Sequence, residues 1–191
     1  MKPAAVLLAG GASSRMGRPK ALLPIAGHTF LGRLIALYTA CCEPVIVVLG
    51  HQAAEIRAGV QPEAQWPEAQ WVVNLRPDLG QFSSLQTGLR AVPAGVDCLF
   101  QPIDYPAVKA ATVELLAGTE GELVIPRFEG KRGHPVRISP AIIAELLSLP
   151  AGGQARDVIR AHYAEAVFVD VADAGVVTDI DTPEDFARWI A

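Results

Sequence analysis

The chain has 191 residues, of which 51% are hydrophobic and 19% are charged, a globular rather than a disordered composition. Its net charge of −4 offers no general basic surface, which excludes nucleic acid as an expected partner, and no apolar run approaches the roughly 20 residues that span a bilayer. We predict a single domain over residues 1–191 with no membrane contact.

In the first half of the chain, apolar runs that end at glycine or proline alternate with segments of helical periodicity. Residues 4–8 are predicted to form a strand buried on both faces. A helix that contains Cys41 and Cys42 is expected between Thr29, its N-cap, and Pro44. The next elements in order are a strand at 45–49, a helix at about 51–58, a surface excursion at 61–70, a strand at 71–74, a helix with Leu85, Leu89 and Val92 on one face, and a strand at 98–101.

The second half continues the same alternation. Its predicted elements in order are a helix with Val113, Leu115 and Leu116, strands at 123–125 and 135–138, helices at 141–147 and 154–163, strands at 167–171 and 176–180, and a helix at 183–190 with Phe186, Trp189 and Ile190 on one face. This pattern predicts an α/β fold, a Rossmann-like three-layer sandwich whose mostly parallel sheet carries helices on both faces.

Cysteine usage and the N-terminal segment indicate a compartment. The three cysteines, Cys41, Cys42 and Cys98, lack CxxC spacing and are expected as buried free thiols. The apolar run at 4–8 is too short for a signal peptide. We therefore expect a cytoplasmic protein.

The loop at residues 10–20 follows the first predicted strand, and ligands of α/β sheets bind beyond the carboxyl ends of the strands. Gly10 and Gly11 are expected to take positive φ and to let the backbone approach an anion closely. Arg15 and Lys20 add charge, whereas hydroxyls come from Ser13 and Ser14. Neither the Walker A pattern nor GxGxxG is present. Composition alone leaves two readings open, a phosphate-binding loop and a glycine-rich surface turn with solvated cations.

The segment LAGGASSRMGRPKALLP resembles the signature L-A-G-G-x-S-x-R-M-G-x-P-K of the nucleotidyltransferases that build the molybdenum cofactor dinucleotides. Three further segments are similar to that family: NLRPDLGQFSSLQTGL at 74–89, PIDYP at 102–106 and DIDTPEDF at 179–186. The resemblance implies a fold of the nucleotide-diphospho-sugar transferase type. RGHPV at 132–136 is typical of the cytidylyltransferase branch, whereas LAGG is more usual in the guanylyltransferase branch, so CTP is favoured and GTP stays open.

The resemblance also implies roles for individual residues. Catalysis is expected from Arg15, Lys20 and Asp104. The residues expected to contact substrates are Leu8, Ala9, Gly10, Gly11 and Ser13 in the first loop, Asn74, Gly80, Ser83 and Ser84 near base and ribose, and His134 near the acceptor. A molybdoenzyme or an insertion chaperone is an expected macromolecular partner.

The implied reaction needs no protein nucleophile. An acceptor phosphate is largely dianionic at neutral pH, with a second pKa of about 6, and attacks the α-phosphorus to expel pyrophosphate. Catalysis then rests on positioning and on charge neutralisation by Lys20 and Arg15, which we expect to be exposed.

Two aspartates are the expected ligands of Mg²⁺, which is commonly held by one or two carboxylates together with phosphates. Asp104 follows an apolar strand, and Asp181 precedes the last helix. Asp179 is an alternative to Asp181, and Asp181 could instead cap that helix.

Two other functions stay open at this stage. One is a nucleotidyltransferase that acts on a sugar phosphate or an alcohol phosphate. The other is a nucleotide-binding regulatory or chaperone module without turnover.

Overall fold

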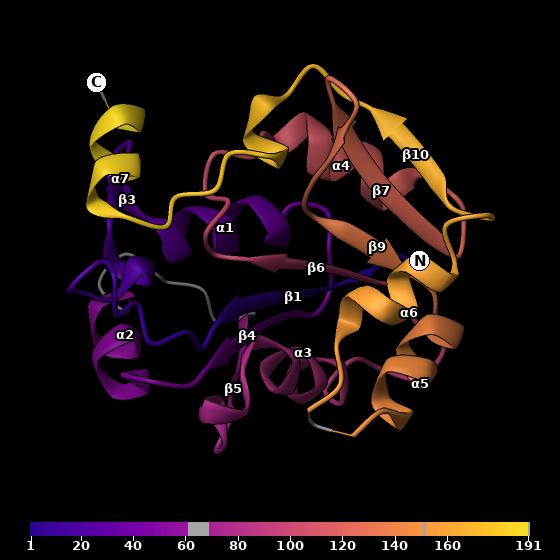
Figure 1. Ribbon diagram of the computed structural model, residues 1–191, viewed down its shortest axis with the longest axis horizontal. Coiled ribbons are helices and arrows are strands. Elements are labelled where there is room, and N and C mark those ends of the chain that lie inside the picture. The colour runs from indigo at the N-terminus through magenta and orange to yellow at the C-terminus, as the bar shows by residue number, and fades with distance from the viewer. Residues whose placement is uncertain (61–68, 151, 191) are drawn as a thin grey trace.

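The computed structural model describes residues 1–60, 69–150 and 152–190, and its centre is an eight-stranded mixed sheet (Figure 1). The strand order is β10-β7-β9-β6-β1-β4-β5, and β8 pairs with β7 alone. The strands of this sheet are β1 (Ala4–Ala9), β4 (Val45–Leu49), β5 (Ala69–Val73), β6 (Cys98–Pro102), β7 (Leu123–Phe128), β8 (Lys131–Arg132), β9 (Val136–Ile138) and β10 (Val167–Asp170).

Parallel pairing dominates the sheet, as predicted. Strand β1 lies parallel to β4 and β6, β4 is parallel to β5, and β7 is parallel to β10. Strand β9 is antiparallel to β6 and β7, and β8 is antiparallel to β7. A two-stranded ribbon, β2 (Pro24–Ile25) with β3 (His28–Thr29), lies outside this sheet.

Helices cover both faces of the sheet, which confirms the predicted three-layer fold. The helices are α1 (Phe30–Thr39), α2 (Ala53–Val60), α3 (Gln81–Leu89), α4 (Ala110–Gly118), α5 (Pro140–Ser148), α6 (Ala155–Ala161) and α7 (Pro183–Ile190). Alternate side chains of β1 point to opposite layers. Ala5 and Leu7 belong to the core that α1, α2 and α4 cover, whereas Val6 and Leu8 belong to the core under α3, α5 and α6. No helix in the described ranges is long and apolar enough to cross a membrane.

The last helix, α7, packs on the start of α1 rather than on the main sheet (Figure 1). The ring of Phe30 lies 5.9 Å from that of Phe186 and 5.8 Å from that of Trp189. Ile190, predicted on the same face, is instead exposed and lies outside this aromatic cluster.

Two sequence predictions in the first half of the chain need correction or lie partly outside the described residues. Helix α1 ends at Thr39, so Cys41 and Cys42 follow it rather than belong to it. All three cysteines are free, as expected, but Cys41 is half-buried rather than buried. Of the predicted surface excursion, 61–68 lie outside the described residues, and Ala69 already starts β5.

The predicted strand at 176–180 is wrong. A short 3-10 helix, Ala174–Val176, is followed by irregular chain. Val176 and Ile180 are buried, but Val176 packs in the core of the main sheet and Ile180 in the α7 cluster. The backbone bonds to other loops as well, since the Ile180 amide donates to the Asp104 carbonyl.

Candidate active site

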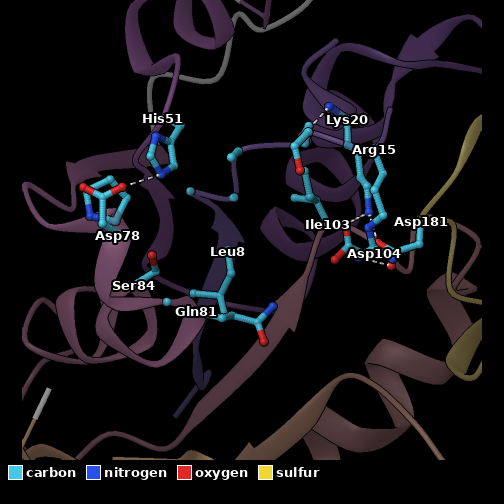
Figure 2. A pocket seen from close by; sticks show the side chains of 17 residues that line it. Leu8, Arg15, Lys20, His51, Asp78, Gln81, Ser84, Ile103, Asp104 and Asp181 are labelled. Carbon is cyan, nitrogen blue, oxygen red and sulfur yellow. Dashed lines mark hydrogen bonds and ion pairs between the residues drawn. The ribbon is translucent and has the colours of Figure 1, made fainter. Parts of the chain in front are cut away.

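Loops from the carboxyl ends of β1, β4 and β6 enclose a cavity of about 420 Å³ (Figure 2). These strands run parallel, so their carboxyl ends share one edge of the sheet. The predicted site residues that line this cavity, called here the loop cavity, are Leu8, Gly10, Gly11, Ser13, Arg15, Lys20, Gly80, Ser84, Asp104 and Asp181.

The first loop is shaped by two contacts. A Cβ atom at Gly10 would lie 2.9 Å from the Ser84 hydroxyl, so only glycine lets β1 come this close to α3. The Lys20 amide donates to the Ser13 hydroxyl over 3.1 Å and closes the turn. Contrary to the prediction, the positive φ values fall at Ser13 (50°) and Gly17 (72°) rather than at Gly10 and Gly11. Ala9 lies inside β1 with its side chain in the core.

Asn74 and Ser83 lie behind the cavity wall and hold Ser84. The Asn74 amide donates to the hydroxyls of Ser83 (2.8 Å) and Ser84 (3.0 Å), and its own oxygen accepts from the Arg76 amide. Both Asn74 and Ser83 are buried and face a smaller hollow near Arg90. Of these three polar side chains, Ser84 is the one that reaches the loop cavity.

Lys20 is buried, in contrast to the exposed cation that the sequence predicted. Its side chain is only 7% exposed, and its ammonium donates to Asp104 Oδ1 over 2.9 Å and to Asp181 Oδ1. Arg15 pairs with the other oxygen of Asp181 over 2.5 Å and is 68% exposed. Burial alone would lower the pKa of Lys20, but the hydrogen bonds and charges of Asp181 and Asp104 outweigh it and raise that pKa.

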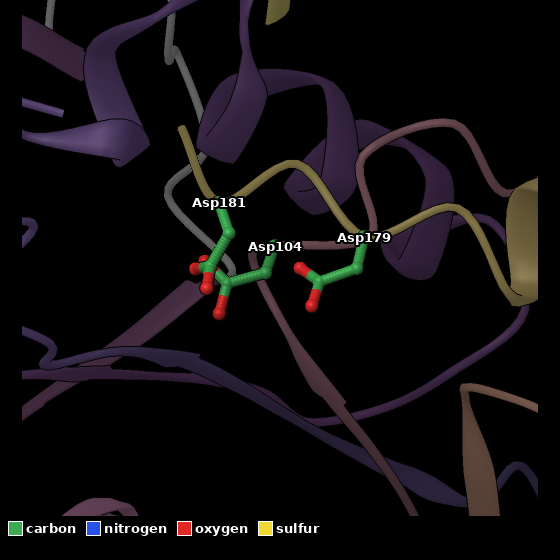
Figure 3. A group of neighbouring side chains, drawn as sticks. All are labelled: Asp104, Asp179 and Asp181. Atoms are coloured by element: carbon green, nitrogen blue, oxygen red, sulfur yellow. The ribbon is translucent and has the colours of Figure 1, made fainter. Parts of the chain in front are cut away.

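Three carboxylates meet at one end of the cavity (Figure 3). One oxygen each from Asp104, Asp179 and Asp181 lies within 4.8 Å of the others. Burial raises the pKa of Asp104 and, together with the charges of Asp104 and Asp181, that of Asp179. The hydrogen bond from Lys20 lowers the pKa of Asp181. Such a set of hard oxygen donors suits a divalent cation of the Mg²⁺ type.

Asp181 does not cap α7. Thr182 has that role, because its hydroxyl accepts from the Asp185 amide over 3.2 Å. The Asp185 carboxylate in turn accepts from the Thr182 amide over 2.9 Å, which completes a reciprocal capping box. The Asp181 side chain is therefore directed to Lys20 and Arg15.

A buried polar chain holds the turn that carries Asp104. The Tyr38 hydroxyl on α1 donates to Gln101 Oε1, and Gln101 Nε2 donates to the Tyr105 carbonyl over 2.7 Å. Gln101 is fully buried in β6. Asp104 is thus positioned by α1, through Tyr38 and Gln101, and by the strand β6 that it follows.

A second cavity of about 600 Å³, called here the aromatic cavity, adjoins the first and shares Leu8, Gly80 and Gln81 with it. Its aromatic lining consists of Phe82, Phe100, Tyr105, Tyr163 and the His134 ring. The guanidinium of Arg132 lies 4.5 Å from the centre of the Tyr163 ring. This cavity could not be predicted from the sequence, because six separate stretches of the chain, from Leu8 to Tyr163, contribute to it.

His134 lies in the wall of the aromatic cavity rather than near the carboxylates. Its ring centre is 4.8 Å from that of Tyr105 and 6.0 Å from that of Phe100. Burial lowers the pKa of His134 to about 4, and its buried Nδ1 atom finds no hydrogen-bond partner in the described part of the chain. The imidazole is therefore neutral at pH 7.

Sequence reasoning missed several residues of the loop cavity. His51, Asp78 and Gln81 line it, and His51 Nε2 lies 3.5 Å from Asp78 Oδ1 (Figure 2). The position of His51 could have indicated a site residue, because it follows β4 at the same sheet edge as the first loop. Gln81 likewise begins a helix directly after Gly80.

Known proteins resemble the whole chain. A molybdenum cofactor guanylyltransferase of Xanthomonas euvesicatoria pv. vesicatoria is 29% identical over 97% of this chain and 93% of its own length. A molybdenum cofactor cytidylyltransferase of Escherichia coli K12 is 26% identical over 95% and 92% of the two chains.

Two solved structures share the fold over nearly their full length. One, from Mycobacterium sp. strain JC1, has a TM-score of 0.80 and 27% identity and covers 98% of this chain and 94% of that one. The other, a Mycobacterium tuberculosis H37Rv protein in complex with manganese, has a TM-score of 0.75 and 26% identity, with 98% and 97% covered. The sequence profile of the MobA-like NTP transferase domain matches residues 5–167. The chain thus belongs to the MobA-like NTP transferase family and is a nucleotidyltransferase related to the enzymes of molybdenum cofactor biosynthesis.

Proposed function

We propose that this protein transfers a nucleoside monophosphate from a nucleoside triphosphate to the phosphate of a molybdopterin-like acceptor, with Mg²⁺ as the metal. The observation that carries this proposal is the pair of adjoining cavities. The loop cavity is lined by cationic side chains, carboxylates and a glycine loop, and the aromatic cavity is lined by aromatic rings. Their shared wall at Leu8, Gly80 and Gln81 is where the two substrates would meet.

The aromatic cavity favours a flat heterocycle over a sugar. Rings stack on the faces of aromatic side chains, whereas each sugar hydroxyl requires a polar partner. Tyr105 and Tyr163 offer such faces, and the neutral His134 offers a hydrogen-bonding nitrogen for a heterocycle. The relatives named as molybdenum cofactor nucleotidyltransferases support the same class of acceptor.

In the proposed reaction, an oxygen of the acceptor phosphate forms a bond to the α-phosphorus. The bond from that phosphorus to the oxygen that bridges the α- and β-phosphates breaks, and pyrophosphate leaves with the electron pair. The attacking oxygen carries no proton at neutral pH, so no general base is required. Lys20 and Arg15 neutralise the charge that develops on the triphosphate, and the glycine loop orients it.

Asp104 and Asp181 are the proposed metal ligands, and Asp179 is close enough to replace or join Asp181. When bound, Mg²⁺ supplies charge neutralisation and orientation for the phosphates. The manganese complex of a relative supports a divalent metal in this fold.

CTP is the proposed donor, with GTP as the alternative. The RGHPV segment supports CTP, whereas the LAGG segment and the guanylyltransferase relative support GTP. The exposed Asp78 carboxylate and the neighbouring His51 ring, across the loop cavity from Asp104 (Figure 2), are polar groups available to read the base.

Pyrophosphate release tests this function. Purified protein is mixed with CTP, GTP, ATP or UTP and with molybdopterin or sugar 1-phosphates, with and without Mg²⁺. We expect release with molybdopterin, with CTP above GTP, and none without the metal. Steady release with sugar phosphates alone would favour the sugar-phosphate enzyme, and nucleotide binding without any release would favour the non-catalytic module.

A further inference from the structure

A side chain occupies the place between the proposed metal ligands. The Lys20 ammonium contacts Oδ1 of Asp104 over 2.9 Å and Oδ1 of Asp181 at the same time. Its side chain is 7% exposed, so these carboxylates replace the water that would otherwise solvate the charge. Arg15 covers the remaining oxygen of Asp181.

A divalent metal and this ammonium compete for the same carboxylate oxygens. Mg²⁺ requires oxygen ligands at about 2.0–2.1 Å in octahedral geometry. A metal bound to the Asp104 oxygen that Lys20 contacts over 2.9 Å would lie about 4 Å from the Lys20 nitrogen, where like charges repel. We therefore expect Lys20 to leave at least one carboxylate when a metal bridges the pair.

The departing ammonium needs a new anionic partner inside the cavity. Without one, a buried charge is left unpaired, which is strongly unfavourable. Lys20 lies at the end of the glycine loop, held there by the bond from its own amide to Ser13, so a triphosphate in that loop is within reach of its side chain.

We propose that Lys20 is the resident counterion of the metal site, and that metal and triphosphate bind cooperatively because the triphosphate takes Lys20 while the metal takes the carboxylates. This inference rests on the proposed metal-dependent function. Coupling of this kind is reciprocal, so each ligand should tighten the other by the same factor. For an exchange of buried charge partners, we expect a factor of roughly ten to one hundred.

Manganese binding to the nucleotide-free protein gives a test that does not depend on turnover. Free Mn²⁺ is measured by electron paramagnetic resonance during titration of wild type and of Lys20→Met, which keeps most of the stem but no charge. We expect the variant to bind Mn²⁺ at least about tenfold more tightly than wild type. The control is Lys131→Met on exposed β8, which should match wild type.

Two arms separate occupation of the site from general electrostatics. At 1 M NaCl, where charge is screened beyond about 3 Å, the difference between Lys20→Met and wild type should persist. Calorimetric titration with an α,β-methylene analogue of CTP should show that Mn²⁺ tightens nucleotide binding by wild type more than by the variant. Lys20→Gln takes the place of Lys20→Met if the latter does not fold.

Equal or weaker Mn²⁺ binding by both Lys20 variants would overturn the counterion role, and so would a difference that vanishes at high salt. If wild type still released pyrophosphate with Mn²⁺ in that case, the proposed function would stand and only the counterion role of Lys20 would be wrong. If neither wild type nor any variant bound Mn²⁺, with or without nucleotide, both the counterion role of Lys20 and the metal-dependent function would be overturned.

Discussion

Lys20 shows how a single side chain can be misread from sequence. In a loop rich in glycine and serine it is predicted as an exposed cation, but it lies buried between Asp104 and Asp181. Its removal would leave two carboxylates close together without the ammonium that separates them. A buried polar group that loses its partner typically costs about 1–3 kcal/mol.

We therefore expect Lys20→Ala to lower both activity and stability. Pyrophosphate release should fall by roughly 10²–10³-fold, by analogy with the loss of one charged donor to a transition state. The free energy of unfolding in urea should fall by about 1–3 kcal/mol, and added Mg²⁺ should restore part of it. Near-normal turnover would remove Lys20 from the mechanism, and unchanged stability would contradict its buried ion pairs.

His134 gives a prediction on pH. Its folded pKa of about 4 lies below the usual value near 6.5, so the unfolded chain takes up a proton between these values and the folded chain does not. Above about pH 6.5 neither state binds this proton, so His134 does not make the stability depend on pH. Below that, the free energy of unfolding should fall as the pH decreases toward 4. The slope approaches about 1.4 kcal/mol for each pH unit.

Urea unfolding between pH 7 and pH 4.5 checks this expectation. His134→Phe keeps a ring against Tyr105 and Phe100 but cannot titrate, so its stability should depend less on pH than that of wild type. The matched control, His28→Gln on the exposed ribbon, should keep the wild-type slope. The same slope in His134→Phe and wild type would show that His134 is not the titrating group.

Among the elements, α7 depends on its cap. Its apolar contacts come from few residues, chiefly Phe186 and Trp189 against Phe30, so the capping box of Thr182 and Asp185 matters for its stability. We expect Thr182→Ala to lower the free energy of unfolding by about 1 kcal/mol. Thr182→Ser, which keeps the capping hydroxyl, is the control. A loss no larger than that of the control would contradict the capping role.

Strands buried on both faces could be predicted well from sequence. Residues 4–8 and 45–49 are continuous apolar runs, and 98–101 is apolar except for the buried Gln101. Glycine or proline follows each run, and each is an inner strand of the sheet. The segment 176–180 has similar composition, but no neighbouring strand pairs with it within the described chain, and its two buried side chains serve different cores. The spacing of apolar residues indicates which side chains are buried. Whether a buried segment forms a strand also depends on a neighbouring strand that pairs with it.

At the scale of the whole molecule, the sequence predicted the parts of the site that lie in one loop or follow one strand. Gly10, Ser13 and Asp104 come together because parallel strands bring their carboxyl ends to one edge. The aromatic cavity could not be predicted in this way, because its walls come from segments as distant as Phe82 and Tyr163. The placing of Asn74 behind Ser84 likewise depends on tertiary contacts.

The central claim is that the two cavities form one metal-dependent nucleotidyl transfer site with Asp104 as its principal ligand. The most direct measurement is a Mg²⁺ titration of pyrophosphate release for wild type and Asp104→Asn, with exposed Asp170→Asn as the control. The variant keeps the size of the side chain and leaves the contact between Lys20 and Asp181, so the nucleotide-free protein should unfold at a similar temperature. We predict a saturable Mg²⁺ dependence for wild type and control, and a rate at least about 100-fold lower for Asp104→Asn at every Mg²⁺ concentration. A wild-type rate and metal midpoint in Asp104→Asn would contradict the account.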